Sequence, residues 1–279
     1  MIPQVDLHCH LLPDWDDGPD TFAESLQMAQ RFSAAGCKTI VVTPHVDRTL
    51  GRPERLTENI APAVAALEQQ LHENGVDIHL IAGGELHLFT ADLARRIGRE
   101  PWLSIGGMGH YVLIESPVNS WPSHAPQMLY HLALAGITPL IAHPERYAEV
   151  QKDVTLMAEL VDKGARLQIT ARSLVGKDRA ARRCSEELLR SGLVAVIASD
   201  AHSSEAVLTH EVVERVIELV GEDAARRVLV DNAIAIVEGK PVRKSTSTKG
   251  RYVLRSRSRS FSWPRIMRAN DEKMRRTNS

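Results

Sequence analysis

The sequence predicts an α/β protein whose parallel strands form a closed or distorted barrel of seven β/α units, with a short C-terminal extension. Seven short segments rich in Val, Ile and Leu are typical of buried strands, and amphipathic stretches of helical length lie between them. Strands that alternate with helices in this way form parallel sheets. With 279 residues, of which 43% are hydrophobic, the chain is long enough for one large α/β barrel or for two ordinary domains.

The predicted elements follow one another in a regular order. Strands are expected at 5–10, 38–45, 78–85, 111–115, 138–143, 165–170 and 193–200. A first helix is expected from the helical spacing of Phe22, Leu26, Ala29 and Phe32, and further helices near 54–74, 122–135, 152–164, 179–191 and 205–219. The first helix has the clearest boundaries, because Thr21 and Glu24 fit a capping box at its start and Gly36 follows its end.

The charges divide the chain into two parts. The net charge is -1, but residues 241–279 contain 12 Lys and Arg against 2 Asp and Glu, which leaves an excess of 11 acidic residues in the rest. We therefore expect an acidic globular domain at 1–239 and a basic Ser/Arg-rich tail at 240–279 that stays mobile. The acidic domain disfavours specific nucleic-acid binding. The tail could be a plain unstructured extension, and its charge would suit anionic membrane lipid or nucleic acid equally.

The sequence also favours a location in the cytoplasm. Three scattered cysteines are too few for a disulfide framework, which indicates a reducing compartment. The first residues do not match a secretory signal, and no apolar run has the length that spans a bilayer. The tail adds the expectation of a peripheral position at the inner face of the membrane.

Histidines and carboxylates end six of the seven predicted strands. His8 and His10 end the first, His45 the second, Glu85 the third, Glu115 the fourth, His143 the fifth, and Asp200 and His202 the seventh. The sixth strand ends in Gln-Ile-Thr, which is polar without being an obvious ligand. In a β/α barrel the carboxyl ends of the strands converge on one face, where active sites are found. These side chains are therefore expected to meet.

A shared polar site at that face predicts bound metal. Ordinary polar strand ends would explain any one of these residues, but not six strands that all end in His, Asp or Glu. Carboxylates packed together would repel one another unless cations compensate their charge. Mixed imidazole and carboxylate ligands suit Zn²⁺, Mn²⁺ or Fe²⁺, and the number of ligands exceeds what one ion needs. The acidic run at 14–17 lies in the loop above the same face and could complete the shell.

These motifs carry a family resemblance. H-C-H-L-L-P-D-W-D-D-G-P, T-P-H, G-G-E, L-I-E, I-A-H-P-E-R-Y and I-A-S-D-A-H resemble the PHP (polymerase and histidinol phosphatase) superfamily over residues 3–238. Within it, the chain is most similar to the bacterial metal-dependent tyrosine-protein phosphatases of capsule and exopolysaccharide biosynthesis. The resemblance implies a distorted (β/α)7 TIM-like barrel and a trinuclear site, often with Mn²⁺. It also implies a phosphotyrosine substrate on a partner tyrosine kinase of polysaccharide export, typically in a cluster of tyrosines at the C-terminus of the kinase.

The resemblance assigns roles to individual residues. The implied metal ligands are His8, His10, Asp17, His45, Glu85, Glu115, His143, Asp200 and His202, with Asp16 as the alternative to Asp17. Arg146 matches the phosphate-binding arginine of the family, and Asp200 or His202 could also act as a general acid. The family usually has a second arginine shortly after the last motif, where this chain reads H-S-S-E-A-V-L-T-H. Arg172, Lys177 or Arg179 could replace it.

The predicted reaction is metal-assisted hydrolysis of a phosphoric monoester, in which a hydroxide bound to the metal attacks phosphorus in line. Manganese is the expected metal, with Fe²⁺ or Zn²⁺ as alternatives. A small-molecule phosphatase of the histidinol-phosphate kind, a nuclease-like PHP domain and a metal-binding regulator without turnover remain as alternatives.

A second motif in the chain has the spacing of another phosphatase class, but we do not expect it to be catalytic. Cys184 and Arg190 have the spacing of cysteine-based tyrosine phosphatases, but the residues between them favour a helix, and two of them are glutamates that would repel phosphate. Cys9 and Cys37 are expected to be small buried residues. Surface or satisfied core positions are expected for His72, His87, His124 and His131, and a position at the far end of the barrel for His110.

Overall fold

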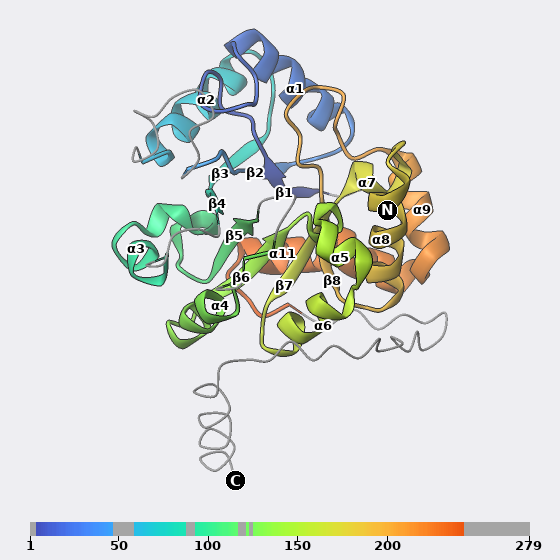
Figure 1. The fold of residues 1–279 in the computed structure, drawn as a ribbon. Coiled ribbons are helices and arrows are strands. Elements are labelled where there is room, and N and C mark those ends of the chain that lie inside the picture. The colour runs from blue at the N-terminus through green and yellow to red at the C-terminus, as the bar shows by residue number, and fades with distance from the viewer. Residues whose placement is uncertain (1–3, 47–58, 88–92, 117–120, 123–124, 243–279) are drawn as a thin grey trace.

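The computed structural model describes residues 4–46, 59–87, 93–116, 121–122 and 125–242, which form two parallel β-sheets with helices around them (Figure 1). The strands are β1 (Val5–Cys9), β2 (Thr39–Val42), β3 (His79–Ala82), β4 (Glu85–His87), β5 (Tyr111–Glu115), β6 (Thr138–Ala142), β7 (Arg166–Thr170) and β8 (Val194–Ala198). The smaller sheet has the order β1-β2-β3 and the larger one the order β4-β5-β6-β7-β8. The predicted α/β class with parallel strands is confirmed.

The third predicted strand is in fact two strands, so the count of seven was wrong. Gly83 and Gly84 separate β3 from β4, and these two strands belong to different sheets. The chain crosses there in close contact with its surroundings, since a Cβ atom on Gly84 would lie 2.9 Å from the Val46 side chain. The Gly-Gly pair is a weak local sign of a break, because glycine is unfavourable in strands, but it does not indicate that the chain changes sheets there.

The two sheets adjoin at the carboxyl ends of their strands. Isolated bridges pair Cys9 with Ala201 on one side and His45 with Glu85 on the other. The amide of Asp200 donates to the carbonyl of His8 at 2.8 Å, which continues the contact between β1 and β8. The strands thus surround a common interior, as in a distorted barrel, although they form two sheets.

The helices largely follow the prediction. They are α1 (Phe22–Ala34), α2 (Ala61–Glu73), α3 (Leu93–Arg99), α4 (Ala125–Leu134), α5 (Ala148–Lys152), α6 (Thr155–Asp162), α7 (Ala171–Val175), α8 (Arg179–Arg190), α9 (His210–Val220), α10 (Glu222–Arg226) and α11 (Asn232–Val237). Short 3-10 helices cover Pro101–Leu103, Ile105–Gly107 and Pro144–Arg146, and a π-helical turn covers Arg227–Asp231. The capping box of α1 is present.

Two of the predicted helices have different boundaries in the structure, and four short helices were not predicted. The α5 and α6 helices replace the single helix expected near 152–164, and α9 begins at His210, after the expected start. The sequence did not predict α3, α7, α10 and α11, which are too short to give a clear apolar period. Residues 54–58 of the helix expected at 54–74 lie outside the described residues.

Side chains of the strands alternate between the interior of the barrel and the outer helices, and this alternation directs some of them toward the site. On β5, Tyr111 and Leu113 pack in the cluster of apolar residues between the strands, whereas Val112 and Ile114 pack against the outer helices. Because strand side chains alternate, Glu115 follows Leu113 on the inner face.

Of the predicted tail, residues 240–279, the first three are described, and residues 243–279 lie outside the described part of the chain. None of the described helices has both the length and the hydropathy that a bilayer-crossing helix needs.

Candidate metal centre

The side chains predicted from the strand ends come together where the two sheets adjoin. The smaller sheet supplies His8, His10 and His45, and the larger supplies Glu85, Glu115, His143, Asp200 and His202 from its strands or the residues after them. The loop between β1 and α1 adds Asp17. Seven of these nine residues are less than 9% exposed. A dense group of imidazoles and carboxylates is thus enclosed at one end of the barrel.

Glu85 lies at the centre of the buried part. One of its carboxylate oxygens, Oε2, is 3.3 Å from Nε2 of both His8 and His10 and 3.2 Å from Nδ1 of His45. Its other oxygen, Oε1, is 3.0 Å from Nε2 of His143. Glu115 lies 3.3 Å from Nδ1 of His45. One carboxylate therefore faces four imidazoles that come from three strands.

A second group lies nearer the surface. Oδ1 of Asp17 is 3.4 Å from Nε2 of His45 and 3.3 Å from Nε2 of His202. The ring of His202 stacks on that of His10, with 3.8 Å between the ring centroids. The side chain of His202 is 32% exposed, so this group can be reached from solvent.

Arg146 contacts this cluster through Asp200. Its guanidinium nitrogen Nη2 lies 2.8 Å from Oδ2 of Asp200, while the other oxygen of Asp200, Oδ1, lies 3.2 Å from His8. The Arg146 side chain is 38% exposed, although Asp200 is buried. A cationic group that can present two parallel N–H donors thus lies at the opening of the cluster, where it can bind an anion.

The spacing of these atoms fits metal coordination. Two ligands of one tetrahedral ion, each about 2.1 Å from it, lie about 3.4 Å apart. Nδ1 or Nε2 atoms of His8, His10, His45 and His202 lie 3.2–3.4 Å from carboxylate oxygens here. Nε2 of His8 also lies 3.2 Å from Nε2 of His10, where both lone pairs can point at one ion.

Among the described residues, three sets of ligand atoms are compact enough to hold an ion. They are His10 with Asp17, His45 and His202; His8 with His10 and Glu85; and His45 with Glu85 and Glu115. The donor set therefore fits more than one metal ion.

The electrostatic field of the cluster favours cations. Burial alone would lower the pKa of His8, but the carboxylates of Glu85 and Asp200 raise it to about 9. Burial likewise opposes ionisation of Glu85, yet the surrounding imidazoles hold its pKa well below its usual value. The site thus stabilises positive charge among its carboxylates, and bound metal ions can supply that charge in place of protons.

Neighbouring groups orient the imidazoles, a role that the sequence did not predict for them. Oε1 of Gln168 lies 3.0 Å from Nδ1 of His8, and Oδ2 of Asp16 lies 2.6 Å from Nδ1 of His10. Such partners on the far ring nitrogen typically set the tautomer of a metal-binding histidine. Gln168 lies on β7, whose polar end was the only signal that could have pointed to it.

Asp16 and Asp17 occupy different positions. Asp16 accepts from the backbone amides of His45 and Gly18 as well as from His10, so its oxygens are engaged in hydrogen bonds. Asp17 has Oδ1 directed toward His45 and His202. The geometry favours Asp17 as the ligand and Asp16 as the group that holds the loop.

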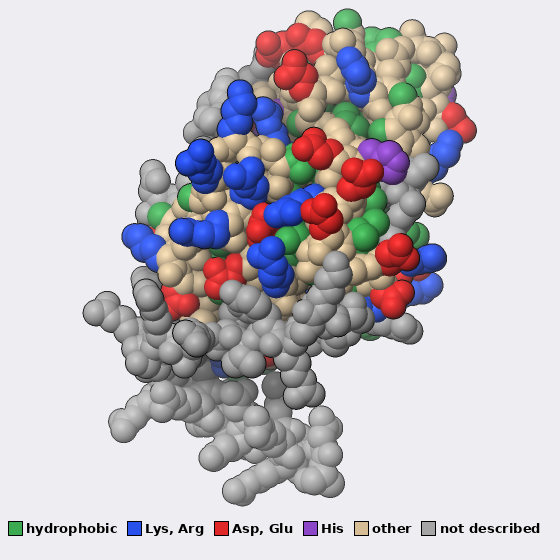
Figure 2. All heavy atoms as spheres, turned by 90° about the vertical axis from the view of Figure 1, so that its right-hand side faces the viewer, with side chains coloured by type: hydrophobic (Ala, Val, Ile, Leu, Met, Phe, Trp, Pro, Cys, Tyr) green, Lys and Arg blue, Asp and Glu red, His purple; other side chains and the backbone are tan. Residues whose placement is uncertain are grey.

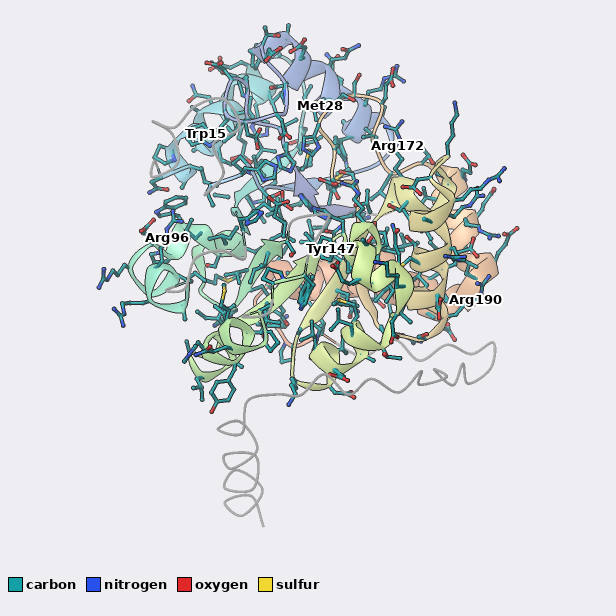
Figure 3. The ribbon with its side chains drawn as sticks, in the orientation of Figure 1. Trp15, Met28, Arg96, Tyr147, Arg172 and Arg190 are labelled. Carbon is teal, nitrogen blue, oxygen red and sulfur yellow. The ribbon has the colours of Figure 1, made fainter. Side chains whose placement is uncertain are left out.

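The segment that carries Arg146 is held from both sides. Glu145 is buried and accepts hydrogen bonds from the amide of Thr170 at 2.9 Å and the hydroxyl of Ser173 at 2.7 Å. The hydroxyl of Tyr147, near the centre of Figure 3, donates to the carbonyl of Ala142 at 2.6 Å. His143, just before this segment, has a positive φ of 35°. The close packing compensates for this uncommon backbone conformation.

Cys184, in the motif with the spacing of cysteine-based phosphatases, lacks the features of a nucleophile. Cys184 is 3% exposed on α8, and burial raises the pKa of its thiol to about 12. Arg190 pairs with Glu186 on the same helix. Cys9 and Cys37 are buried, as predicted.

The remaining cations and histidines lie outside the cluster. Among the described residues, no hydrogen bond or ion pair joins Arg172, Lys177 or Arg179 to the site, so Arg146 is the arginine that contacts it. His72 and His131 are exposed, His87 is buried, and His124 lies outside the described residues. His110 precedes β5 and packs closely against Gly239.

Known proteins share both this sequence and this fold. The chain is 34% identical to the tyrosine-protein phosphatase YwqE of Bacillus subtilis, over 71% of this chain and 77% of the relative. It is 33% identical to the putative tyrosine-protein phosphatase CapC of Staphylococcus aureus, with the same coverage. A solved structure from a study of YwqE from Bacillus subtilis and CpsB from Streptococcus pneumoniae, described as unique metal-dependent tyrosine phosphatases, aligns with a TM-score of 0.80 and 29% identity. That alignment covers 88% of this chain and 100% of the other.

More distant structures share the fold alone. The phosphotriesterase homology protein of Escherichia coli aligns with a TM-score of 0.54 at 13% identity. The family model for capsular polysaccharide synthesis, CpsB/CapC, matches residues 4–238, which include every residue of the cluster. The chain belongs to the CpsB/CapC family of capsular polysaccharide synthesis proteins.

Proposed function

We propose that this protein is a metal-dependent protein-tyrosine phosphatase that acts in the control of capsular or exopolysaccharide synthesis. The names of its relatives support the activity, and the family to which it belongs supports the process. The observation that carries the proposal is the nine-residue cluster of imidazoles and carboxylates with Arg146 at its opening. The catalytic domain would comprise residues 1–239, followed by the basic tail at 240–279.

The proposed ligands are the nine residues of the cluster. They would hold two or three divalent ions, and Mn²⁺ is our first choice, with Fe²⁺ and Zn²⁺ as alternatives, because imidazole and carboxylate ligands are mixed. When bound, such ions make water nucleophilic near neutral pH and stabilise negative charge on phosphoryl oxygens.

Arg146 would bind and orient the phosphoryl group. Its guanidinium is always charged and can hold two phosphoryl oxygens, so it both positions the group and stabilises the charge that builds up on it. Asp200, 2.8 Å away, would keep the guanidinium in place before substrate enters. The ring nitrogen Nδ1 of His202 lies 3.1 Å from the carbonyl oxygen of Asp200, which favours a proton on that nitrogen and leaves Nε2 facing the cluster.

Departure of the tyrosine side chain needs little acid catalysis. Its phenol has a pKa of about 10, so the phenolate is a better leaving group than an alkoxide. Asp200 and His202 would therefore serve first as ligands, and a proton from either would be a secondary contribution.

The partner we propose is a tyrosine kinase of polysaccharide export whose phosphotyrosines are the substrate. Such a partner would place the enzyme in the cytoplasm, at the inner face of the membrane. The basic tail could strengthen this position, because each Lys or Arg near an anionic surface contributes about 1 kcal/mol. Deleting residues 241–279 should then abolish pelleting with anionic liposomes at low salt, and pelleting that persists would contradict the role of the tail.

The test of the activity compares two substrates and several metals. Protein stripped with chelator would be assayed on a phosphotyrosine peptide and on histidinol phosphate, without metal and with Mn²⁺, Fe²⁺, Zn²⁺ or Mg²⁺. We expect metal to restore hydrolysis of the phosphotyrosine peptide, in wild type and in Cys184→Ser alike. The loss of activity in Cys184→Ser alone would instead support the cysteine motif.

Other outcomes would favour other functions. Preference for histidinol phosphate would indicate a small-molecule phosphatase with the same metal chemistry. Metal binding without turnover of either substrate would indicate a regulator.

A further inference from the structure

Five basic residues beside the metal centre have no acidic partner. They are Arg172 on α7, Lys177 between the helices, and Arg179, Arg182 and Arg183 on α8; we call them the α7–α8 basic patch. Among the described residues no ion pair includes any of them, whereas Arg190 and Arg215 on the same side of the molecule are paired with Glu186. The one carboxylate within the segment, Asp178, caps α8 by accepting from two amides.

The patch belongs to the elements that support Arg146. Ser173 of α7 binds Glu145, and α8 packs against the 3-10 helix Pro144–Arg146. Because α8 returns the chain to the start of β8, its N-terminal turn lies at the end of the barrel where the strands terminate. In Figure 3, Arg172 lies in the upper part of the view, and Arg190, the last residue of α8, lies lower, toward the other end of that helix. The basic patch therefore borders the face that holds the cluster.

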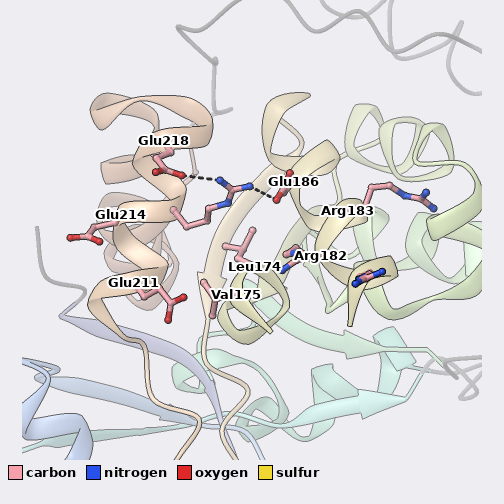
Figure 4. Close-up of a pocket in the computed structure, with 10 residues that line it drawn as sticks. Leu174, Val175, Arg182, Arg183, Glu186, Glu211, Glu214 and Glu218 are labelled. Carbon is pink, nitrogen blue, oxygen red and sulfur yellow. Dashed lines mark hydrogen bonds and ion pairs between the residues drawn. The ribbon is translucent and has the colours of Figure 1, made fainter. Parts of the chain in front are cut away.

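A groove of about 640 Å³ lies between α8 and α9 (Figure 4). Arg179, Arg182 and Arg183 line one side, and Glu211 and Glu214 on α9 line the other. Between them Arg215 pairs with Glu186 and Glu218, so these three charges are compensated within the groove. Figure 2 shows this side of the molecule, where several basic side chains gather left of centre and acidic side chains lie beside them near the middle.

We propose that the α7–α8 basic patch binds anionic groups that flank the phosphotyrosine of a polypeptide substrate. The proposal rests on the proposed phosphatase function and adds a determinant of substrate choice. Unpaired guanidinium groups can bind carboxylates and phosphates through two parallel hydrogen bonds, and those of the patch belong to the elements that support Arg146, the proposed phosphoryl-binding residue. The carboxylates of Glu211 and Glu214 repel anions from the α9 side, which confines an acidic chain to the α8 side of the groove.

The anionic groups could be side-chain carboxylates or a second phosphoryl group, and three peptides distinguish these sources. One peptide places alanines beside the phosphotyrosine, one places glutamates there, and one places a non-hydrolysable phosphotyrosine analogue there. The metal-loaded full-length enzyme would be assayed on each peptide and on a small aryl phosphate. We expect a lower KM for the two anionic peptides and a similar kcat, because contacts outside the reacting group are uniform binding interactions.

The variant that tests the patch is Arg179→Ala with Arg182→Ala and Arg183→Ala. It should lower kcat/KM about tenfold on the anionic peptides and leave the alanine peptide and the aryl phosphate unchanged, since exposed ion pairs are individually weak. The matched control removes three exposed cations elsewhere, Arg31, Arg99 and Lys152, which lie on α1, α3 and α5. The control variant has the same net charge as the patch variant. A difference between the two variants therefore reports local binding rather than the overall charge of the protein.

A binding measurement keeps the proposal independent of turnover. Fluorescence anisotropy with the same peptides, made with a phosphonate in place of the scissile phosphate, reports affinity even if no ester is hydrolysed. Patch-dependent binding without hydrolysis would refute the proposed function and support docking. Equal affinity of wild type for all peptides, or equal losses in patch and control variants, would refute docking. Patch-dependent pelleting with anionic vesicles, without peptide preference, would assign the patch to lipid and refute the proposal.

Discussion

Asp16 and Asp17 are adjacent carboxylates whose surroundings separate their roles. Asp16 is engaged by His10 and by the amide of His45, whereas Asp17 faces two imidazoles. Asp17→Ala should therefore remove a ligand and lower metal content. Asp16→Asn should lower metal affinity by about 10- to 100-fold at most, because its amide oxygen can still accept from His10.

Metal titration with elemental analysis measures both effects, with Asp20→Ala, an exposed carboxylate of the same loop, as the control. A larger loss in Asp16→Asn than in Asp17→Ala would reverse the two assignments.

We expect the buried carboxyl group of Asp6 to make the stability of the metal-free protein depend on pH. Burial raises its pKa from 3.8 to about 6, although hydrogen bonds from Ser199 oppose the rise. Because the folded state holds this proton more tightly than the unfolded state, the stabilising contribution is complete below pH 3.8 and is lost as the pH rises through 6. Between about pH 5 and pH 7 this group should lower the free energy of unfolding by about 1 kcal/mol.

Asp6→Asn should lack that component, because an amide oxygen can still accept from Ser199 and does not ionise. Urea unfolding of both proteins at the two pH values measures the difference in chelator-treated samples. The same pH slope in wild type and variant would contradict the role of Asp6.

At the scale of elements, the loop between β1 and α1 is held against the strand end that it follows. A Cβ atom on Gly18 would lie 2.5 Å from the carbonyl oxygen of His10, so only glycine allows this approach. Gly18→Ala should displace the loop that carries Asp16 and Asp17, and so weaken metal binding and activity while the barrel stays folded.

Gly98→Ala is the control for Gly18→Ala, because a Cβ atom there meets nothing within 4 Å on the exposed side of α3. The control should be neutral or stabilise the helix by up to about 1 kcal/mol. Circular dichroism and metal titration distinguish the outcomes; normal metal affinity in Gly18→Ala would show that the loop tolerates the shift.

The elements that could be predicted from the sequence are those with a strong local pattern. Strands β5 to β8 and helix α1 matched because apolar runs and caps mark them. The break between β3 and β4 was missed because it depends on a packing contact with Val46, which is distant in sequence. Similarly, the ligand-type residues could be read from strand ends, but Gln168 and Asp16 could not, since their roles depend on which ring nitrogen they face.

At the scale of the whole molecule, the cluster lies where the two sheets adjoin. His8, His10 and His45 come from one sheet, and Glu85, Glu115 and Asp200 come from the other. Among the described residues, isolated bridges join the strands of the two sheets there, and few backbone hydrogen bonds cross the boundary. Metal ions that take ligands from both sides would therefore stabilise the fold as well as support the reaction.

Metal removal should accordingly lower the unfolding temperature of the entire domain. Ligand that binds only the folded state at 100 times its dissociation constant stabilises by about 2.7 kcal/mol, and for a domain of this size that is a shift of several degrees. Differential scanning calorimetry of full-length protein with chelator and with added Mn²⁺ measures the shift. Glu85→Gln replaces the carboxylate that contacts histidines from both sheets with a neutral amide, so it should reduce the metal-dependent shift of the unfolding temperature. A midpoint that is unchanged by metal in wild type would mean that the two sheets are held together without the ions, and that the cluster serves the reaction alone.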